Sequence, residues 1–171
     1  MTVDRASSVD GLPPLREVIE AHGLRAQKSL GQNFLLDMNI TDKIVREAMN
    51  RDGGDWSGVN AIEVGPGPGG LTRALLKSSV SSVTAVEFDE RAVNALQGLK
   101  DSAAGDLDIH HGDALKTNLL GIVEGPRVIV ANLPYNVATP LLIGWLKQVR
   151  DNVDAYKCMA LMFQKEVAER I

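Results

Sequence analysis

Short apolar segments alternate with helical segments from Asn60 onward, and this alternation limits the fold more than any other feature of the sequence. The apolar segments predict strands at residues 61–64, 83–86, 107–110, 127–131 and 156–163. Most of them are apolar at consecutive positions, which is typical of strands that helices cover on both faces. The sequence therefore predicts an α/β fold with a doubly wound, mainly parallel sheet. We expect its first and fourth strands to be neighbours, with a ligand at their carboxyl ends.

The start of the chain has a different pattern, which predicts helices and a connecting loop. One helix is expected to begin after Pro13 and Pro14 and to end at Gly23, and another to begin near Ile40. The loop between them, residues 24–37, is polar and basic but also contains a phenylalanine and leucines. These apolar side chains favour a loop that packs against another part of the molecule.

These patterns divide the chain into an N-terminal helical segment, residues 1–58, and a sheet-containing core, residues 59–171. Residues 51–58 are rich in Gly and Asp and are expected to be a linker between the two.

The last third of the chain predicts two further helices. Thr139 is expected to cap a helix that has Pro140 at its first position. Its inner face is expected to consist of Leu141, Leu142, Trp145, Leu146 and Val149. The final helix is expected to begin at Gln164 and to turn Val167, Ala168 and Ile171 inward. The only cysteine, Cys158, lies in an apolar run and is expected to be a buried thiol.

Charge and hydropathy exclude several classes of protein. Eighteen basic and 22 acidic residues give a net charge of −4, which argues against holding nucleic acid by overall charge alone and leaves a local basic surface open. No apolar run approaches the roughly 18 residues of a membrane span, and the N-terminus has no apolar stretch typical of a signal peptide. We therefore expect a cytoplasmic protein with no membrane partner.

The turn after the first predicted strand contains Gly65, Gly67 and Gly70, which fit the pattern G-x-G-x-x-G. Glycines in this position allow the backbone to approach a ligand closely. Two features argue against a nicotinamide cofactor. Glu63 lies inside the strand, and two prolines remove amide donors that a pyrophosphate would use.

Acidic side chains follow the next two predicted strands. Glu87 ends the second strand, where a carboxylate can accept both hydroxyls of a ribose. Asp113 follows the third strand, where it can accept a hydrogen bond from an adenine amino group. His110 and His111 have no further histidine or cysteine at ligand spacing, so no metal site is expected.

The fourth predicted strand ends in Asn132-Leu133-Pro134-Tyr135. An exocyclic amine on a base is a poor nucleophile because its lone pair is delocalised into the ring. An asparagine carbonyl and a backbone carbonyl beside the proline can accept its two hydrogens and localise the lone pair, and a tyrosine can stack on the base. These four residues are the candidate catalytic residues.

Taken together, the motifs resemble those of the ribosomal RNA adenine dimethyltransferase family, most closely its bacterial small-subunit (16S) branch of the kasugamycin-resistance type. In chain order the matching segments are Gly31-Gln32-Asn33-Phe34-Leu35, the turn from Glu63 to Thr72, Glu87, Gly112-Asp113-Ala114, Asn132-Leu133-Pro134-Tyr135-Asn136, Thr139-Pro140-Leu141-Leu142 and Phe163-Gln164-Lys165-Glu166-Val167-Ala168. The resemblance extends from about residue 24 to residue 171.

The resemblance implies a Rossmann-like, class I S-adenosylmethionine-dependent methyltransferase. Such enzymes dimethylate N6 of two adjacent adenines in a 3′-terminal hairpin of small-subunit rRNA, within a ribosomal assembly intermediate. The residues implied to bind S-adenosylmethionine are Asn33, Leu35, Gly65, Glu87, Asp113 and Asn132. Residues 1–58 would then carry a loop facing cofactor and RNA. The family continues with two more strands and a helical C-terminal domain, whereas this sequence stops after the fifth strand.

Three alternatives stay open. One is a large-subunit rRNA adenine dimethyltransferase of the macrolide-resistance type, and another is a non-catalytic RNA-binding ribosome-assembly module with the same fold. A nicotinamide oxidoreductase is a more distant third. The full-length family form is expected to be monomeric. The 171-residue chain is expected to bind cofactor, to methylate poorly and to self-associate through its fifth strand.

Overall fold

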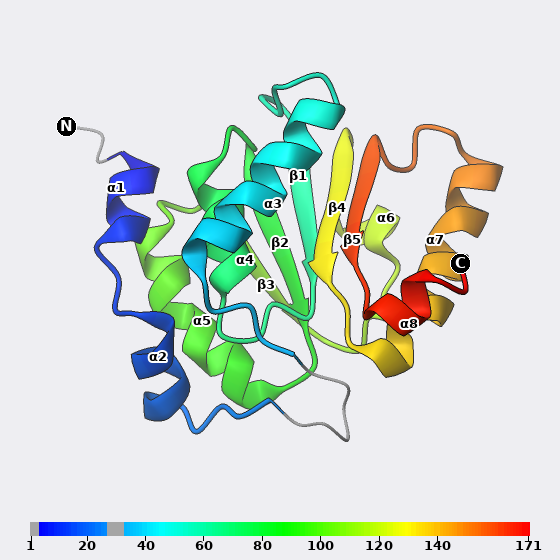
Figure 1. Ribbon diagram of the computed structural model, residues 1–171. Coiled ribbons are helices and arrows are strands. Elements are labelled where there is room, and N and C mark those ends of the chain that lie inside the picture. Colours follow the sequence, from blue (N-terminus) through cyan, green and yellow to red (C-terminus); the bar gives the residue numbers. More distant parts are fainter. Residues whose placement is uncertain (1–3, 27–32) are drawn as a thin grey trace.

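A five-stranded parallel sheet forms the centre of the computed structural model, which describes residues 4–26 and 33–171 (Figure 1). The strands lie in the order β3-β2-β1-β4-β5, and every neighbouring pair is parallel. The strands are β1 Asn60–Val64, β2 Ser82–Glu87, β3 Leu107–His111, β4 Arg127–Asn132 and β5 Cys158–Met162. The predicted doubly wound sheet is confirmed, including the placement of the first strand beside the fourth.

Helices cover both faces of the sheet. They are α1 Arg5–Asp10, α2 Leu15–Ala21, α3 Met38–Arg51, α4 Gly70–Lys77, α5 Glu90–Ser102, α6 Leu119–Ile122, α7 Tyr135–Asp151 and α8 Lys165–Ala168. Residues of α1, α3, α4 and α5 share one core cluster with Ala61 of β1, and residues of α6 and α7 share the other with Ile62. Since neighbouring strand residues point to opposite faces, β1 needs apolar side chains at consecutive positions.

The short helix α1 escaped prediction because six residues are too few for a helical period to be visible. Asp4 caps α1, and Arg5 connects this helix to the rest of the molecule. The Arg5 guanidinium donates to the backbone oxygens of Ser78 and Val80 at 2.9 and 2.8 Å and pairs with Asp106 at 2.8 Å.

The predicted linker at residues 51–58 contains a core residue. Trp56 is completely buried, its indole N–H donates to Asp52 Oδ2 at 2.8 Å, and its backbone N–H donates to Ser79 Oγ at 2.9 Å. The glycine-rich sequence around Trp56 does not predict its burial, because the residues that pack against it come from elsewhere in the chain.

The predicted start of the helix at Thr139 is wrong. α7 begins at Tyr135, directly after Pro134, and Pro140 lies inside the helix. Pro134 has a φ of −57° and a ψ of 134°, an extended conformation suited to the residue that precedes a helix. The inner face is also narrower than expected, since Leu146 is 48% exposed.

The last part of the chain is less covered than its sequence suggests. α8 is four residues long and has no fully buried residue. The prediction of an inward face is wrong for Ala168 and Ile171, which are exposed, and Val167 is half-buried. The predicted buried thiol is wrong too, because Cys158 is only half-buried on β5, an edge strand of the sheet. Within residues 4–26 and 33–171, no helix combines the length and apolarity needed to cross a membrane.

Candidate functional site

Two adjoining cavities lie at the carboxyl ends of β1, β2 and β4, where the sheet order places a ligand site. The smaller has a volume of about 60 Å³ and the larger about 240 Å³. Both are lined by Gly65, Glu87 and Pro134, so they form two parts of one site.

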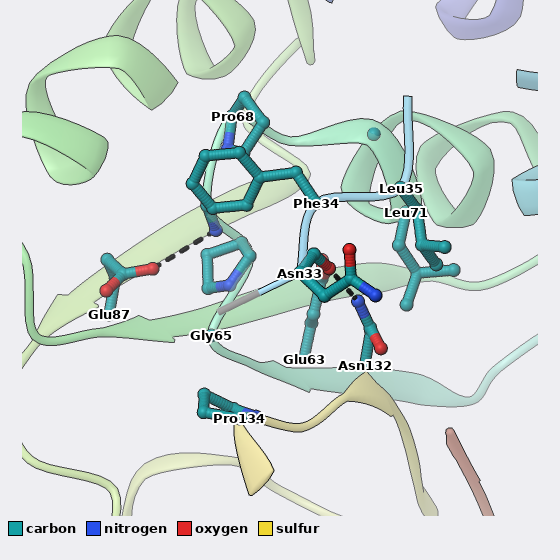
Figure 2. Close-up of a pocket in the computed structure, with 13 residues that line it drawn as sticks. Asn33, Phe34, Leu35, Glu63, Gly65, Pro68, Leu71, Glu87, Asn132 and Pro134 are labelled. Carbon is teal, nitrogen blue, oxygen red and sulfur yellow. Dashed lines mark hydrogen bonds between the residues drawn. The ribbon is translucent and has the colours of Figure 1, made fainter. Parts of the chain in front are cut away.

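The glycine turn lets the loop after residue 32 close over it. A Cβ at Gly70 would lie 2.4 Å from the backbone oxygen of Leu35, and a Cβ at Gly67 would lie 3.0 Å from the ring of Phe34. Gly67 also has a φ of +55°, which L side chains rarely adopt. Figure 2 shows the Phe34 ring beside this turn. The expectation that the polar loop packs against something is therefore confirmed.

A hydrogen bond joins that loop to the end of β4. The side-chain amide of Asn132 donates from Nδ2 to the backbone oxygen of Asn33 at 2.6 Å (Figure 2). The bond brings together two residues that are 99 positions apart in the chain. It also orients the Asn132 amide, with its nitrogen toward the loop. Gly31 and Gln32, which belong to the same motif, lie outside the described residues.

Glu87 is a buried carboxylate held by the backbone. It is 7% exposed and accepts hydrogen bonds from the N–H groups of Gly67, Phe88 and Asp89 at 3.1, 2.8 and 2.9 Å. Burial raises the pKa of Glu87, and the three N–H groups oppose that rise. They also fix the carboxylate beside the glycine turn, where its remaining lone pairs can accept from a ligand.

Glu63 is a second buried acid, 2% exposed, which lines the smaller cavity. The hydroxyl of Thr72 donates to its Oε2 at 2.5 Å. Burial raises the pKa of Glu63 to about 8, and the neighbouring Glu87 adds to the rise. At neutral pH this carboxyl is mostly protonated, and a cation placed beside it would favour its ionised form.

The larger cavity has mostly apolar walls and an acid at its edge. Its side-chain lining includes Val86, Val137 and Leu141, and Asp113 lies on the same cavity. Asp113 is anchored, because its Oδ1 accepts from the backbone N–H of Leu115 at 2.9 Å. Phe88, which is 73% exposed, also contributes to the wall. This lining suits a flat apolar ring that carries a polar edge.

The four candidate catalytic residues take different positions. Asn132 lines the smaller cavity and Pro134 lines both cavities. Leu133 is 5% exposed, packs into the core, and donates its backbone N–H to Met162 O at 3.3 Å. Tyr135 is the first residue of α7 and is 44% exposed, outside the lining of either cavity.

The structure therefore groups most of the predicted site residues. Those on the smaller cavity are Asn33, Leu35, Gly65, Glu87 and Asn132, and Asp113 is on the larger. Several residues that line the cavities were not predicted as site residues, namely Phe34, Pro66, Pro68, Leu71, Val137 and Leu141. The one visible indication was Phe34, an aromatic residue in a polar loop.

The described part of the chain contains no group of three or more His, Cys, Asp or Glu side chains able to hold a metal ion. Of the two adjacent histidines, His111 is exposed, and its Nε2 lies 3.2 Å from the backbone oxygen of Phe88.

Comparison with known proteins gives consistent matches. The family model described as "Ribosomal RNA adenine dimethylase" matches residues 23–171. A protein named "Ribosomal RNA small subunit methyltransferase A" from Rhodopseudomonas palustris (strain TIE-1) is 54% identical over 166 residues, which cover 96% of this chain and 56% of that protein. The chain thus spans about half the length of the curated relatives it matches.

Solved structures agree with these matches. A dimethyladenosine transferase from Plasmodium falciparum has a TM-score of 0.64 and 30% identity, covering 81% of this chain and 46% of that one. The 23S rRNA methyltransferase ErmE has a TM-score of 0.54 and 25% identity, covering 66% of this chain and 42% of that one.

Proposed function

The chain belongs to the ribosomal RNA adenine dimethylase family, and on this premise we propose that it is the cofactor-binding and catalytic part of a small-subunit rRNA methyltransferase. Such an enzyme transfers methyl groups from S-adenosylmethionine to N6 of two adjacent adenines in a 3′-terminal hairpin. The RNA would be presented within a ribosomal assembly intermediate, which would place the protein in the cytoplasm. Residues 1–58 would supply the loop that faces cofactor and RNA, and residues 59–171 would form the methyltransferase core.

The residues present fit an S-adenosyl group. Glu87 is held by three backbone N–H groups at the junction of the two cavities, where it would accept from the ribose hydroxyls. The apolar walls of the larger cavity suit an adenine ring, and Asp113 would accept from its amino group. Asn33, Leu35 and Gly65 would hold the methionine end in the smaller cavity.

Glu63 adds electrostatic support to this arrangement. When bound, S-adenosylmethionine supplies an electrophilic methyl group on a positively charged sulfur. Glu63 is buried on the smaller cavity with a pKa of about 8, so a cation beside it would draw it into its ionised form. The resulting carboxylate would favour a cationic cofactor over an uncharged one.

The end of β4 would prepare the attacking amine. Because Asn132 Nδ2 donates to Asn33 O, its carbonyl oxygen would be the atom that accepts a hydrogen from adenine N6. A backbone carbonyl beside Pro134 would accept the second hydrogen, and together they localise the nitrogen lone pair. Tyr135, exposed at the start of α7, would stack on the target base. No general base is required, since the proton can leave to water once the nitrogen carries positive charge.

The observation that carries this proposal is the hydrogen bond from Asn132 to Asn33, at the edge where Glu87 and the glycine turn also meet. The test measures methyl incorporation into undermethylated small ribosomal subunits, with the 171-residue chain and the full-length protein side by side. We expect incorporation with the full-length protein and little with the 171-residue chain. Absence of incorporation with the full-length protein would contradict the proposal.

The macrolide-resistance type of enzyme is a second candidate, since ErmE shares the fold and 25% identity. Leu133 and the run at residues 139–142 favour the small-subunit type. Offering large-subunit RNA in the same assay separates the two types. A non-catalytic assembly module would bind small subunits without transferring methyl groups.

A further inference from the structure

A third cavity, of about 320 Å³, lies between α2 and the pair α4 and α5. We call it the α2–α5 cavity. Of the residues that line the two cavities of the proposed site, it shares only Pro68. It is therefore a separate space behind the glycine turn, and the proposed methyl transfer assigns no role to it.

One side chain of this lining, Arg73 of α4, is a buried cation. It is 7% exposed, and among the described residues no acceptor lies within hydrogen-bond distance of its buried Nε. No carboxylate of those residues forms an ion pair with it either. Burial lowers the pKa of Arg73. Buried polar groups are normally hydrogen-bonded, so an arginine whose buried Nε has no partner calls for an acceptor, and its positive charge favours an anionic one.

The rest of the cavity limits what that partner can be. Its walls include the apolar side chains of Val18, Ala21, Ala95 and Leu99, while the exposed Glu17 lies on the α2 side. His22 and Asn94 are further polar members of the lining. A phosphate carries more negative charge than a carboxylate, so Glu17 on the same lining would repel it more strongly. A carboxylate matches the paired donors of a guanidinium, and a short hydrocarbon body would fill the apolar space.

We propose that the α2–α5 cavity binds a small organic monocarboxylate, with its carboxylate on Arg73 and its hydrocarbon part between α2 and α5. Glu17 lines the same cavity and is the competing partner within the chain. In this structure Glu17 is exposed and makes no ion pair with Arg73. The two acids would repel each other, so removing the charge of Glu17 should strengthen binding of the ligand.

The test is a titration of the ¹⁵N-labelled 171-residue chain with hexanoate, followed through the Arg73 Nε–H signal. We expect a saturable shift of this signal and at least tenfold weaker binding of hexan-1-ol, which lacks the carboxylate. Arg73→Met should weaken hexanoate binding at least tenfold, measured on the signals of the cavity walls. Glu17→Gln should bind hexanoate more tightly than the parent.

Two variants on α5 test the proposal without changing Arg73, so the test does not depend on whether Arg73→Met folds. A Cβ at Gly98 would meet nothing within 4 Å, so Gly98→Leu can extend into the cavity, and it should weaken binding at least tenfold while Arg73 stays in place. Gln97→Leu, exposed on the same helix and outside the lining, should bind like the parent. Absence of a saturable shift in both the parent and Glu17→Gln would overturn the proposal. Equal binding of hexanol and hexanoate would overturn it as well.

Discussion

The centre of the sheet and its β5 edge differ in how completely the chain covers them. In β1, β2 and β4 nearly every residue is buried, whereas all five residues of β5 are only partly buried and α8 has no buried residue. Three of the proposed cofactor residues, Gly65, Glu87 and Asn132, lie at or directly after the carboxyl ends of these central strands. The difference indicates that the proposed cofactor site rests on a well-packed core, while β5 and α8 are less well packed. We therefore expect cofactor binding to be robust in this chain and methyl transfer to be poor.

The largest effect is expected at the end of β4, where the two regions meet. In the full-length protein, Asn132→Ala should lower the rate of methyl transfer by about 10²–10³-fold, because it removes a group that orients the attacking amine. Asn39→Ala, exposed on α3, is the matched control and should retain the parent rate. A parent-like rate in Asn132→Ala would remove this residue from the amine site.

Removal of the buried Glu87 carboxylate should weaken cofactor binding. Glu87→Ala removes charge-assisted hydrogen bonds of about 1.5–3 kcal/mol each, so the dissociation constant for S-adenosylmethionine should rise about tenfold or more. Glu90→Ala, exposed in the first turn of α5, should bind like the parent. Calorimetric titration measures both, and equal affinities would rule out the ribose assignment.

A single added methyl group tests whether stability and cofactor binding need the loop packed on the glycine turn. Gly70→Ala would place a Cβ 2.4 Å from Leu35 O, so the loop must shift. This shift should lower the free energy of unfolding by about 1–3 kcal/mol and weaken cofactor binding. Gly144→Ala, in α7 with nothing within 4 Å of the new Cβ, should instead raise the free energy of unfolding by about 0.5–1 kcal/mol. Denaturant unfolding of the two variants checks these signs, and similar stabilities would show that the loop does not need Gly70.

The raised pKa of Glu63 should make the stability of the protein depend on pH. Its pKa is raised from 4.5 to about 8 in the folded protein, so between these values the folded state binds more protons than the unfolded state. Stability should therefore fall as pH rises from about 4.5 to 8, by at most about 1.4 kcal/mol per pH unit. Glu63→Gln should show a smaller decline, and the raised pKa of Glu87 accounts for the part that stays. Unfolding curves across this pH range measure it, and identical slopes for parent and variant would argue against a buried neutral acid.

The smallest effect concerns the β5 edge. An apolar edge strand invites pairing with another copy, so the 171-residue chain should show weak, concentration-dependent dimerisation in sedimentation experiments. A chain that stays monomeric at every concentration up to about the millimolar range would show that partial cover is enough to protect this edge.

The sheet could be predicted because most of its strands contain consecutive apolar residues, although β3 does not. Glu87 and Asn132 could be placed together because the carboxyl ends of parallel strands meet at one edge. Contacts that depend on loop geometry could not be predicted, such as the closure of Leu35 onto Gly70. The burial of Arg73 could not be predicted either. An arginine in a short helix is ordinarily exposed, and this one lies in a cavity formed with α2 and α5. The wrong start of α7 followed from giving Pro140 more weight than Pro134.

Calorimetric titration of the 171-residue chain with S-adenosylmethionine and, separately, with NAD tests the proposed cofactor site most directly. We expect saturable binding of S-adenosylmethionine and none of NAD, because the glycine turn, Glu87 and Asn132 come together within the described residues. Binding of NAD, or failure of the folded chain to bind S-adenosylmethionine, would contradict the claim that this chain contains a complete S-adenosylmethionine site.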